Sequence, residues 1–269
     1  MNETKVLAGV TVLLTRPEPH LPEQAERLPA AIRERGGEVH LLPLIEIDPL
    51  ADQELEGSTK TRIMNLDQYD KAIFVSTNAA RLGMAWIDRY WPQLPVGLEA
   101  YAVGPGTGTK LQQLPWPVYW PAQGITSEDL LRLPQLQQVS GQRVALFRGV
   151  GGREVLAGTL RERGATVDYL ELYRRNPPAY DEGVLVDLLA RHSVTAVVVT
   201  SAQILEVMLQ LLGGDVSTMT HVVVIVPSER IRQLALEAGL VKVVNAGGAD
   251  DDTTLAVLTT LAAKNGSHR

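Results

Sequence analysis

The chain of 269 residues contains no cysteine. This excludes disulfide bonds, thiolate catalysis, and zinc or iron–sulfur sites with cysteine ligands. Its five histidines are scattered, and none forms a pair at the spacing of metal ligands, so we expect no metal site. The sequence also lacks a Ser-His-Asp order, a nucleophile elbow and a carboxylate pair in a recognisable motif.

Long apolar runs and an excess of positive charge are missing too. No stretch reaches the length of a bilayer span, and the apolar run 6–14 lacks the basic start and the cleavage pattern of a signal peptide. We therefore expect a cytoplasmic protein that does not bind membranes. The formal net charge of −6 argues against nucleic-acid binding. A local cluster of arginines and backbone N–H groups can still hold an anion.

The chain contains a tandem duplication. Residues 33–39 (RERGGEV) return as residues 161–167 (RERGATV), and three other segments recur in the same order: 10–16 as 143–148, 71–79 as 195–203, and 99–107 as 221–230. A period of about 130 residues is too long for a solenoid. Two related lobes predict a cleft, which is a default place for a small-molecule site.

Short β-branched segments alternate with amphipathic segments along both halves. We expect strands at 10–15, 38–47, 72–75, 99–103, 118–120, 143–147, 166–173, 196–199, 222–226 and 241–245. We expect helices at 23–35, 77–87, 107–113, 127–133, 154–163, 203–212, 229–238 and 253–264, the last capped by Asp252. This alternation predicts an α/β fold with two doubly wound lobes, each a parallel sheet flanked by helices.

Candidate binding loops follow the predicted strands, because ligands of open parallel sheets bind beyond the carboxyl ends of the strands. These loops place hydroxyl side chains, glycines or arginines at helix N-termini, which suit carboxylate or phosphate groups. The loops are 15–16, 76–78, 104–107, 148–153, 200–201 and 227–230. The alternative is that the Ser, Thr and Asn side chains there only cap helices.

Two of these loops are rich in glycine. The segment 104–108 (GPGTG) lacks both the G-x-G-x-x-G spacing and a Gly-Lys-Ser/Thr ending, so a nucleotide site there is disfavoured. The segment 148–153 (RGVGGR) places two arginines around glycines that let backbone N–H groups approach a ligand. The alternative is a turn with solvated arginines. Tyr173 precedes a segment, 174–178, that we interpret as a linker, and it either packs there or faces the cleft.

From Val12 to about Leu261, the chain resembles the uroporphyrinogen-III synthase family. No single segment is specific, but the ordered set is. Its members are 13–17 (LLTRP), 73–79 (IFVSTNA), 102–104 (AVG) with Thr107, 126–131 (TSEDLL), 148–153 (RGVGGR) with Leu160, 164–167 (GATV), 172–175 (LYRR) and 199–201 (VTS).

The resemblance implies two similar flavodoxin-like lobes joined by two extended linkers. It also implies that the first strand–helix unit packs with the C-terminal half, a point that the repeat alone leaves open. The first lobe would comprise 1–40 plus 176–269 and the second 47–168, with linkers at about 41–46 and 169–175. We expect a monomer, because no long exposed apolar face stands out.

The resemblance also implies an enzyme, a carbon–oxygen lyase that works without a cofactor or metal. Its substrate is hydroxymethylbilane, handed over transiently by hydroxymethylbilane synthase. The enzyme removes water, closes the ring and inverts ring D through a spiro-pyrrolenine, giving uroporphyrinogen III for haem, sirohaem and cobalamin. A non-catalytic module that binds a tetrapyrrole or another anion, with a regulatory role, is the alternative.

By its position in the motif, Tyr173 matches the tyrosine proposed to assist loss of the hydroxyl group. Two loops depart from the family pattern: Ser228 stands in a loop that lacks the usual threonine, and Gln203 stands where serine is common. The candidate substrate-binding residues are Thr15, Arg16, Ser76, Asn78, Gly104, Thr107, Arg148, Gly149, Gly152, Arg153, Ser201, Gln203, Ser228 and Arg230.

Overall fold

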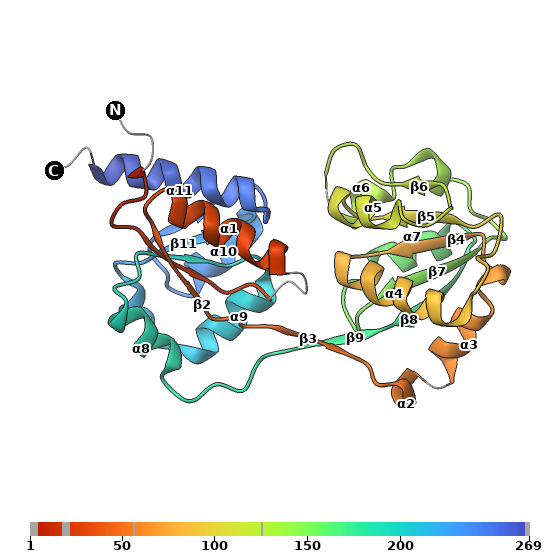
Figure 1. Ribbon diagram of the computed structural model, residues 1–269, viewed down its shortest axis with the longest axis horizontal. Helices are drawn as coiled ribbons and strands as arrows, with labels where there is room; N and C mark the ends of the chain where they lie inside the picture. Colours follow the sequence, from red (N-terminus) through yellow and green to blue (C-terminus); the bar gives the residue numbers. More distant parts are fainter. Residues whose placement is uncertain (1–4, 18–21, 56, 125, 267–269) are drawn as a thin grey trace. The chain divides into compact units, whose positions relative to one another are not determined.

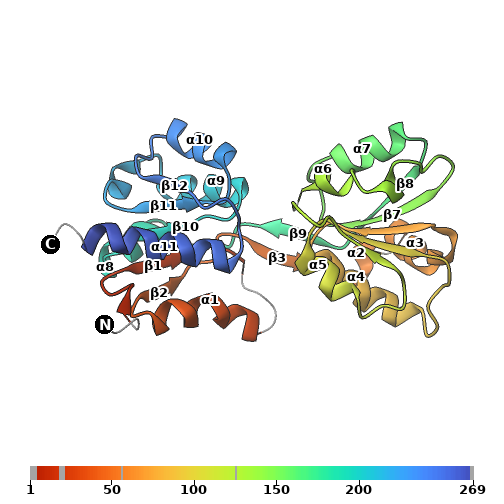
Figure 2. The same cartoon turned by 90° about the horizontal axis from the view of Figure 1, so that it is seen from above.

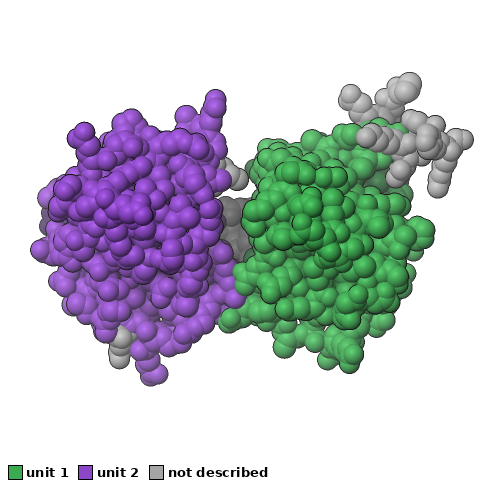
Figure 3. All heavy atoms as spheres, turned by 180° about the vertical axis from the view of Figure 1, so that it is seen from behind, with its two compact units in different colours: residues 1–46, 176–269 green, residues 47–175 purple. Residues whose placement is uncertain are grey.

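The computed structural model describes residues 5–17, 22–55, 57–124 and 126–266. The ends 1–4 and 267–269 and the segment 18–21 of the expected first lobe lie outside the described residues. Two compact units make up the chain (Figure 3). Unit 1 comprises Met1–Glu46 and Asn176–Arg269, and unit 2 comprises Ile47–Arg175. None of the helices in the described ranges has the length and apolarity of a bilayer span.

Unit 1 is built on a five-stranded parallel sheet in the order β12-β11-β10-β1-β2. Its strands are β1 (Thr11–Leu14), β2 (Glu38–Leu41), β10 (Ala196–Val198), β11 (Val223–Val226) and β12 (Val243–Asn245). Its helices are α1 (Pro22–Glu34), α8 (Val184–Arg191), α9 (Ala202–Leu211), η4 (Val216–Met219), α10 (Glu229–Glu237) and α11 (Asp251–Gly266). Helices α1 and α11 pack on one face, and α9 and α10 lie across the other (Figure 2).

Unit 2 has an equivalent parallel sheet in the order β6-β5-β4-β7-β8. Its strands are β4 (Lys71–Phe74), β5 (Glu99–Ala102), β6 (Val118–Tyr119), β7 (Arg143–Arg148) and β8 (Thr166–Glu171). Its helices are α2 (Asp52–Leu55), α3 (Ser58–Met64), η2 (Leu66–Gln68), α4 (Thr77–Tyr90), α5 (Pro105–Leu111), α6 (Ser127–Leu130), η3 (Pro134–Leu136) and α7 (Val155–Glu162).

Successive side chains of β4 point to opposite faces of the sheet, so the core of unit 2 has two layers. Ala72 and Phe74 pack with α3, α4 and α5, whereas Ile73 packs with α6 and α7 on the other face. Because the strand is buried on both faces, residues 72–74 are all apolar rather than alternating with polar residues.

The recurring sequences occupy equivalent strands. β1, β2, β10, β11 and β12 take the same sheet positions as β7, β8, β4, β5 and β6, and each recurring segment falls on a matching pair. The N-terminal strand pairs with the C-terminal half, since Val12 lies opposite Ala196. The two remaining strands, β3 (Glu46–Pro49) and β9 (Tyr173–Asn176), form a two-stranded sheet of their own (Figure 1).

Some sequence-based expectations were wrong in detail. Helix α8 was missed, because its eight residues follow the segment interpreted as a linker. Asp250, not Asp252, caps α11 by accepting the Thr253 N–H at 2.9 Å, while Asp252 pairs with Arg27. Strand β8 also continues through Glu171, so residues 169–171 belong to a sheet rather than to a linker.

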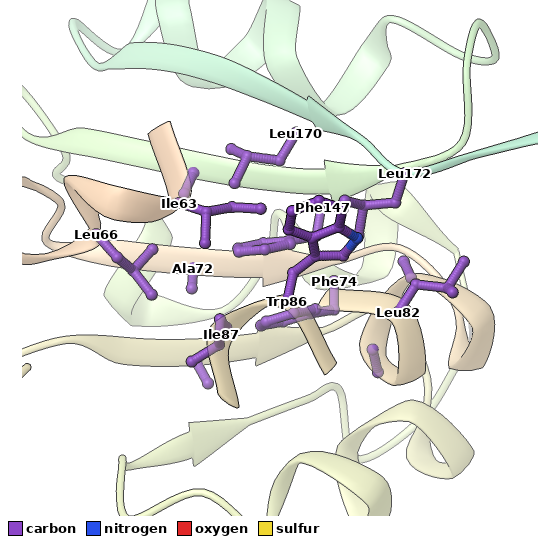
Figure 4. Close-up of a cluster of buried hydrophobic side chains, with 14 of the residues drawn as sticks. Ile63, Leu66, Ala72, Phe74, Leu82, Trp86, Ile87, Phe147, Leu170 and Leu172 are labelled. Atoms are coloured by element: carbon purple, nitrogen blue, oxygen red, sulfur yellow. The ribbon is translucent and has the colours of Figure 1, made fainter. Parts of the chain in front are cut away.

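Gly83 lets α4 approach the sheet of unit 2. The rings of Phe74 and Phe147 stack with their centroids 4.3 Å apart beneath this helix (Figure 4). A Cβ atom at residue 83 would lie 2.8 Å from Phe147 Cδ1 and 2.9 Å from Phe74 Cε1. A helix with any larger residue there would have to move away from the core.

We therefore expect Gly83→Ala to lower the free energy of unfolding by about 1–3 kcal/mol through overpacking. Gly158→Ala in α7 is the matched control, because no atom lies within 4 Å of its added Cβ. This control should be neutral or stabilising by up to about 1 kcal/mol. Urea unfolding of both variants measures the difference, and equal midpoints would contradict the packing argument.

His40 and His192 predict a pH dependence of stability. Their ring centroids lie 3.8 Å apart, between β2 and the end of α8. Burial, followed by the charge of His192, lowers the pKa of His40, and Glu38 opposes this in part. The unfolded chain therefore binds more protons below its His pKa of about 6.5, so the fold loses stability as the pH falls through the lower folded pKa.

We expect His40→Gln to reduce the loss of unfolding free energy between about pH 7.5 and about pH 5.5, because it removes the titrating group. His221→Gln is the control, since His221 is exposed and makes no ring contact in the described part of the chain. Urea unfolding at the two pH values tests this. An unchanged slope in the His40 variant would refute it.

Candidate functional site

The predicted site residues lie beyond the carboxyl ends of the strands of their own unit. In unit 2, Ser76 and Asn78 follow β4, Gly104 and Thr107 follow β5, and Arg148, Gly149, Gly152 and Arg153 end or follow β7. In unit 1, Thr15 and Arg16 follow β1, Ser201 and Gln203 follow β10, and Ser228 and Arg230 follow β11. Each set of three strands is adjacent in its sheet, so each unit carries one continuous edge of candidate residues.

Both edges contain a topological switch point. The chain proceeds outward in one direction from β10 and in the other from β1, and the same reversal separates β4 from β7. In open α/β sheets, ligands bind outside the carboxyl ends of strands at such points, because the flanking loops diverge there. In unit 2 this place lies between Ser76 and Arg148.

The hydroxyl of Tyr173 lies at the switch point of unit 2. Its oxygen is 2.9 Å from Ser76 Oγ, and the side chain as a whole is fully buried. Ser76 caps α4 by accepting the Ala79 N–H at 3.1 Å. The phenol oxygen therefore lies beside the N-terminus of α4, where free N–H groups and the helix dipole favour negative charge.

Gly149 fixes the position of that phenol ring. A Cβ atom at residue 149 would lie 2.7 Å from Tyr173 Cε2 and 3.0 Å from Cζ. The neighbouring Val150 N–H donates to the Tyr173 carbonyl at 2.8 Å. The sequence suggested that this glycine lets a ligand approach, whereas here its missing side chain accommodates Tyr173.

Arg148 is buried rather than solvated, which rules out the alternative drawn from the sequence for this residue. Its guanidinium lies 4.7 Å from the centroid of the Tyr169 ring and 3.1 Å from Glu154 Oε1. The hydrogen bond from the Tyr169 hydroxyl lowers the pKa of Glu154, and Arg148 acts in the same direction. A Cβ atom at Gly152, where φ is +97°, would lie 2.9 Å from an Arg148 nitrogen.

Two other predicted arginines already have carboxylate partners. Arg153 pairs with Glu128, and Arg16 pairs with Asp251 at the start of α11. Arg230 is exposed and makes no ion pair within the described ranges. A ligand carboxylate would therefore compete with an internal one at Arg16, Arg148 and Arg153. Arg16 and Asp251 lie 235 positions apart, and no sequence signal connects them.

Helix capping accounts for much of the remaining pattern. Ser201 and Ser228 cap α9 and α10 as Ser76 caps α4, and Thr15 donates to the Val198 carbonyl at 2.7 Å. Gly104 is the N-cap residue of α5, and Thr107 is buried in that helix. Of the three capping serines, Ser76 alone is seen to contact another predicted site residue within the described chain.

The glycines of 104–108 also serve packing, since a Cβ atom at Gly108 would overlap the Trp120 ring. No group of three or more potential metal ligands gathers in the part of the chain that the structure describes. Sequence reasoning missed one contact of Tyr173: Arg175, two residues further along β9, lies 3.3 Å from the tyrosine hydroxyl.

Comparisons with known proteins give consistent matches. The family model described as uroporphyrinogen-III synthase HemD matches residues 26–255. The uroporphyrinogen-III synthase of Escherichia coli K12 is 32% identical over 261 residues, covering 93% of this chain and 100% of that protein.

Two solved structures share the fold. A mutant uroporphyrinogen III synthase from Thermus thermophilus aligns with a TM-score of 0.61 and 19% identity, covering 96% of this chain and 100% of the other. A uroporphyrinogen-III synthetase from Helicobacter pylori 26695 aligns with a TM-score of 0.58 and 14% identity, covering 94% and 99%. These structures support a mixed α/β fold with parallel sheets for this chain.

The duplication supplies a matched test of the Ser76–Tyr173 contact. Ser76→Ala and Ser201→Ala each remove one N-cap, which costs about 1 kcal/mol of unfolding free energy. Ser76→Ala also removes a buried hydroxyl partner, so we expect it to cost about 0.5–1.5 kcal/mol more. In a Tyr173→Phe background this excess should disappear. Chemical unfolding measures all four variants, and an excess that persists would show that the hydroxyl pair is not its cause.

Proposed function

Because the chain belongs to the uroporphyrinogen-III synthase family, we propose that it closes hydroxymethylbilane to uroporphyrinogen III. The resemblance found in the sequence is confirmed. A relative of that name aligned along its whole length favours an enzyme of tetrapyrrole synthesis over a non-catalytic binding module. The reaction makes the protein a cyclising carbon–oxygen lyase, acting in the cytoplasm on substrate handed over by hydroxymethylbilane synthase.

The chemistry asks for one proton donor and for accurate positioning. The hydroxymethyl group leaves as water, so a donor must lie near its oxygen. Electron release from the adjacent pyrrole drives this departure, and the donor need not be a strong acid. The harder task is to hold the chain so that ring D reacts at its substituted carbon, and geometry supplies that selectivity.

Tyr173 is the proposed donor. The observation that carries this role is its contact with Ser76 at the switch point of unit 2, with Gly149 against the ring. Packing and hydrogen bonds thus hold the phenol oxygen in one place. A preorganised donor of this kind spends no free energy on reorientation during the reaction.

The loops at the carboxyl ends of the strands in each unit carry groups suited to substrate carboxylates. Backbone N–H groups at the starts of α4, α5, α9 and α10 are suited to this, with the hydroxyl of Ser228. The Thr15 hydroxyl donates to the Val198 carbonyl and the Ser76 hydroxyl faces Tyr173, so these two residues shape the loops rather than donate to a carboxylate. Asn78, Gln203 and Arg230 extend from the first turns of α4, α9 and α10. We assign Arg16, Arg148 and Arg153 to carboxylates that replace their internal partners. Such a site explains how a chain with a net charge of −6 binds a polyanion.

The proposal extends to the type of fold in each unit. The strand order of unit 1, in chain order 2-1-3-4-5, fits a flavodoxin-like lobe, and unit 2 fits a permuted copy of it. Ser228 takes the place of the threonine common in the family, with its side chain at the N-terminus of α10.

Incubation with enzymatically generated hydroxymethylbilane, followed by separation of uroporphyrin isomers I and III, tests the function. We expect isomer III from the wild-type protein. Tyr173→Phe should lower the rate of its formation by about 10²-fold, because a donor to the leaving group is lost. Formation of isomer I alone by the wild-type protein would refute the function, and full activity of Tyr173→Phe would remove Tyr173 from the mechanism.

A further inference from the structure

We propose that Arg175 is a positioning residue that stabilises negative charge on the Tyr173 oxygen while that tyrosine donates its proton. Its guanidinium nitrogen lies 3.3 Å from the hydroxyl, and its guanidinium carbon lies 5.8 Å from the ring centroid. The inference rests on the proposed function and gives a role to a residue that lies in the motif 172–175 but was not among the candidate site residues.

Hydrogen-bond chemistry defines what each neighbour does. An arginine can only donate, so the phenol oxygen is the acceptor in its contact with Arg175. Ser76 Oγ already accepts the Ala79 N–H, which leaves its own proton available for the phenol oxygen. Either hydroxyl can donate in the contact between Ser76 and Tyr173, and the proposal assigns Ser76 as the donor. With Ser76 and Arg175 both donating to the phenol oxygen, the proton of Tyr173 is left for the leaving hydroxyl.

The proton moves from the Tyr173 hydroxyl to the leaving hydroxyl of the substrate and is later returned. The O–H bond of Tyr173 breaks, and its proton joins the hydroxymethyl oxygen. The C–O bond breaks with its electron pair on oxygen, water leaves, and the pyrrole nitrogen lone pair stabilises the carbon left behind. After ring closure, the proton lost by the substrate returns to the phenolate oxygen.

Because Tyr173 is buried, a negative charge on its oxygen requires a positive charge nearby. The Tyr173 side chain has no exposed surface, and an ionised group away from water is costly unless it is paired and hydrogen-bonded. Ser76 and the N-terminus of α4 supply dipoles, whereas Arg175 supplies a full positive charge. The contribution of Arg175 is therefore greatest at the moment when Tyr173 has lost its proton.

Strand geometry separates Arg175 from its neighbour. Side chains alternate along β9, so residues 173 and 175 share one side and residue 174 points to the other. Arg174 pairs with Glu54, and this hydrogen bond lowers the pKa of the carboxyl. The chain thus offers two adjacent exposed arginines, of which one contacts the candidate donor and one does not.

The experiment compares Arg175→Gln with Arg174→Gln in the isomer assay. We expect Arg175→Gln to lower kcat by about 10²-fold with little change in KM, because the lost interaction matters mainly in the transition state. Arg174→Gln should retain the wild-type kcat. Arg175→Lys, which keeps the charge, should have a kcat close to that of the wild type. If Arg175→Gln unfolds at the assay temperature, the kcat of Arg175→Lys is compared with that of Arg174→Gln instead.

A double-mutant cycle isolates the contact. In a Tyr173→Phe background, Arg175→Gln should cause no further loss, because there is no phenolate to stabilise. Equal kcat values for the two glutamine variants, or a loss that multiplies with that of Tyr173→Phe, would overturn the role of Arg175 while leaving the proposed function intact. Only a wild-type protein that yields isomer I alone would refute both.

Discussion

The pairing of β1 with β10 is the constraint on which the architecture depends. It joins Val12 to Ala196 in one parallel ladder, and the Thr15 hydroxyl extends the contact to the Val198 carbonyl. Because the N-terminal strand lies inside a sheet made mostly by the C-terminal half, the chain must leave unit 1 and return to it. β3 and β9 are the two segments that make these passages.

The returning segment brings Tyr173 to the candidate site. β9 begins directly after β8, and the Leu172 N–H donates to the Arg148 carbonyl at 2.9 Å. The tyrosine ring then enters the same apolar cluster as Phe74 and Phe147, with Gly149 beside it. The core of unit 2 and the position of the proposed proton donor are therefore produced by the same packing.

Two of the candidate arginines are paired with a carboxylate of their own unit. Arg16 and Arg148 end or follow equivalent strands, β1 and β7, and each pairs with a carboxylate at the start of a helix. Such pairs keep a desolvated guanidinium compensated while no ligand is bound. They also set a condition for binding, because a substrate carboxylate must offer at least the hydrogen bonds that the internal carboxylate gives up.

Several features of the fold follow from local sequence. The duplication, the parallel α/β pattern and the serine caps were readable because strand burial, helix capping and glycine at helix ends act within a few residues. The family was readable because its motifs kept their order along the chain. Helix α8 was not, since its eight residues carry no start signal and its neighbours come from α9.

The sequence by itself determined most of the strands, the glycine-rich loops and Tyr173 as a candidate, but it did not separate β2 from β3 or β8 from β9. The repeat alone left the partner of β1 open and the family resemblance implied it, as the structure shows. Only the tertiary structure decided that Gly149 accommodates the Tyr173 ring and that Arg148 is buried with Glu154. The reason is physical. Backbone preferences and capping are local, whereas the partner of a charged or hydroxyl group is set by which distant strand ends the sheet places side by side.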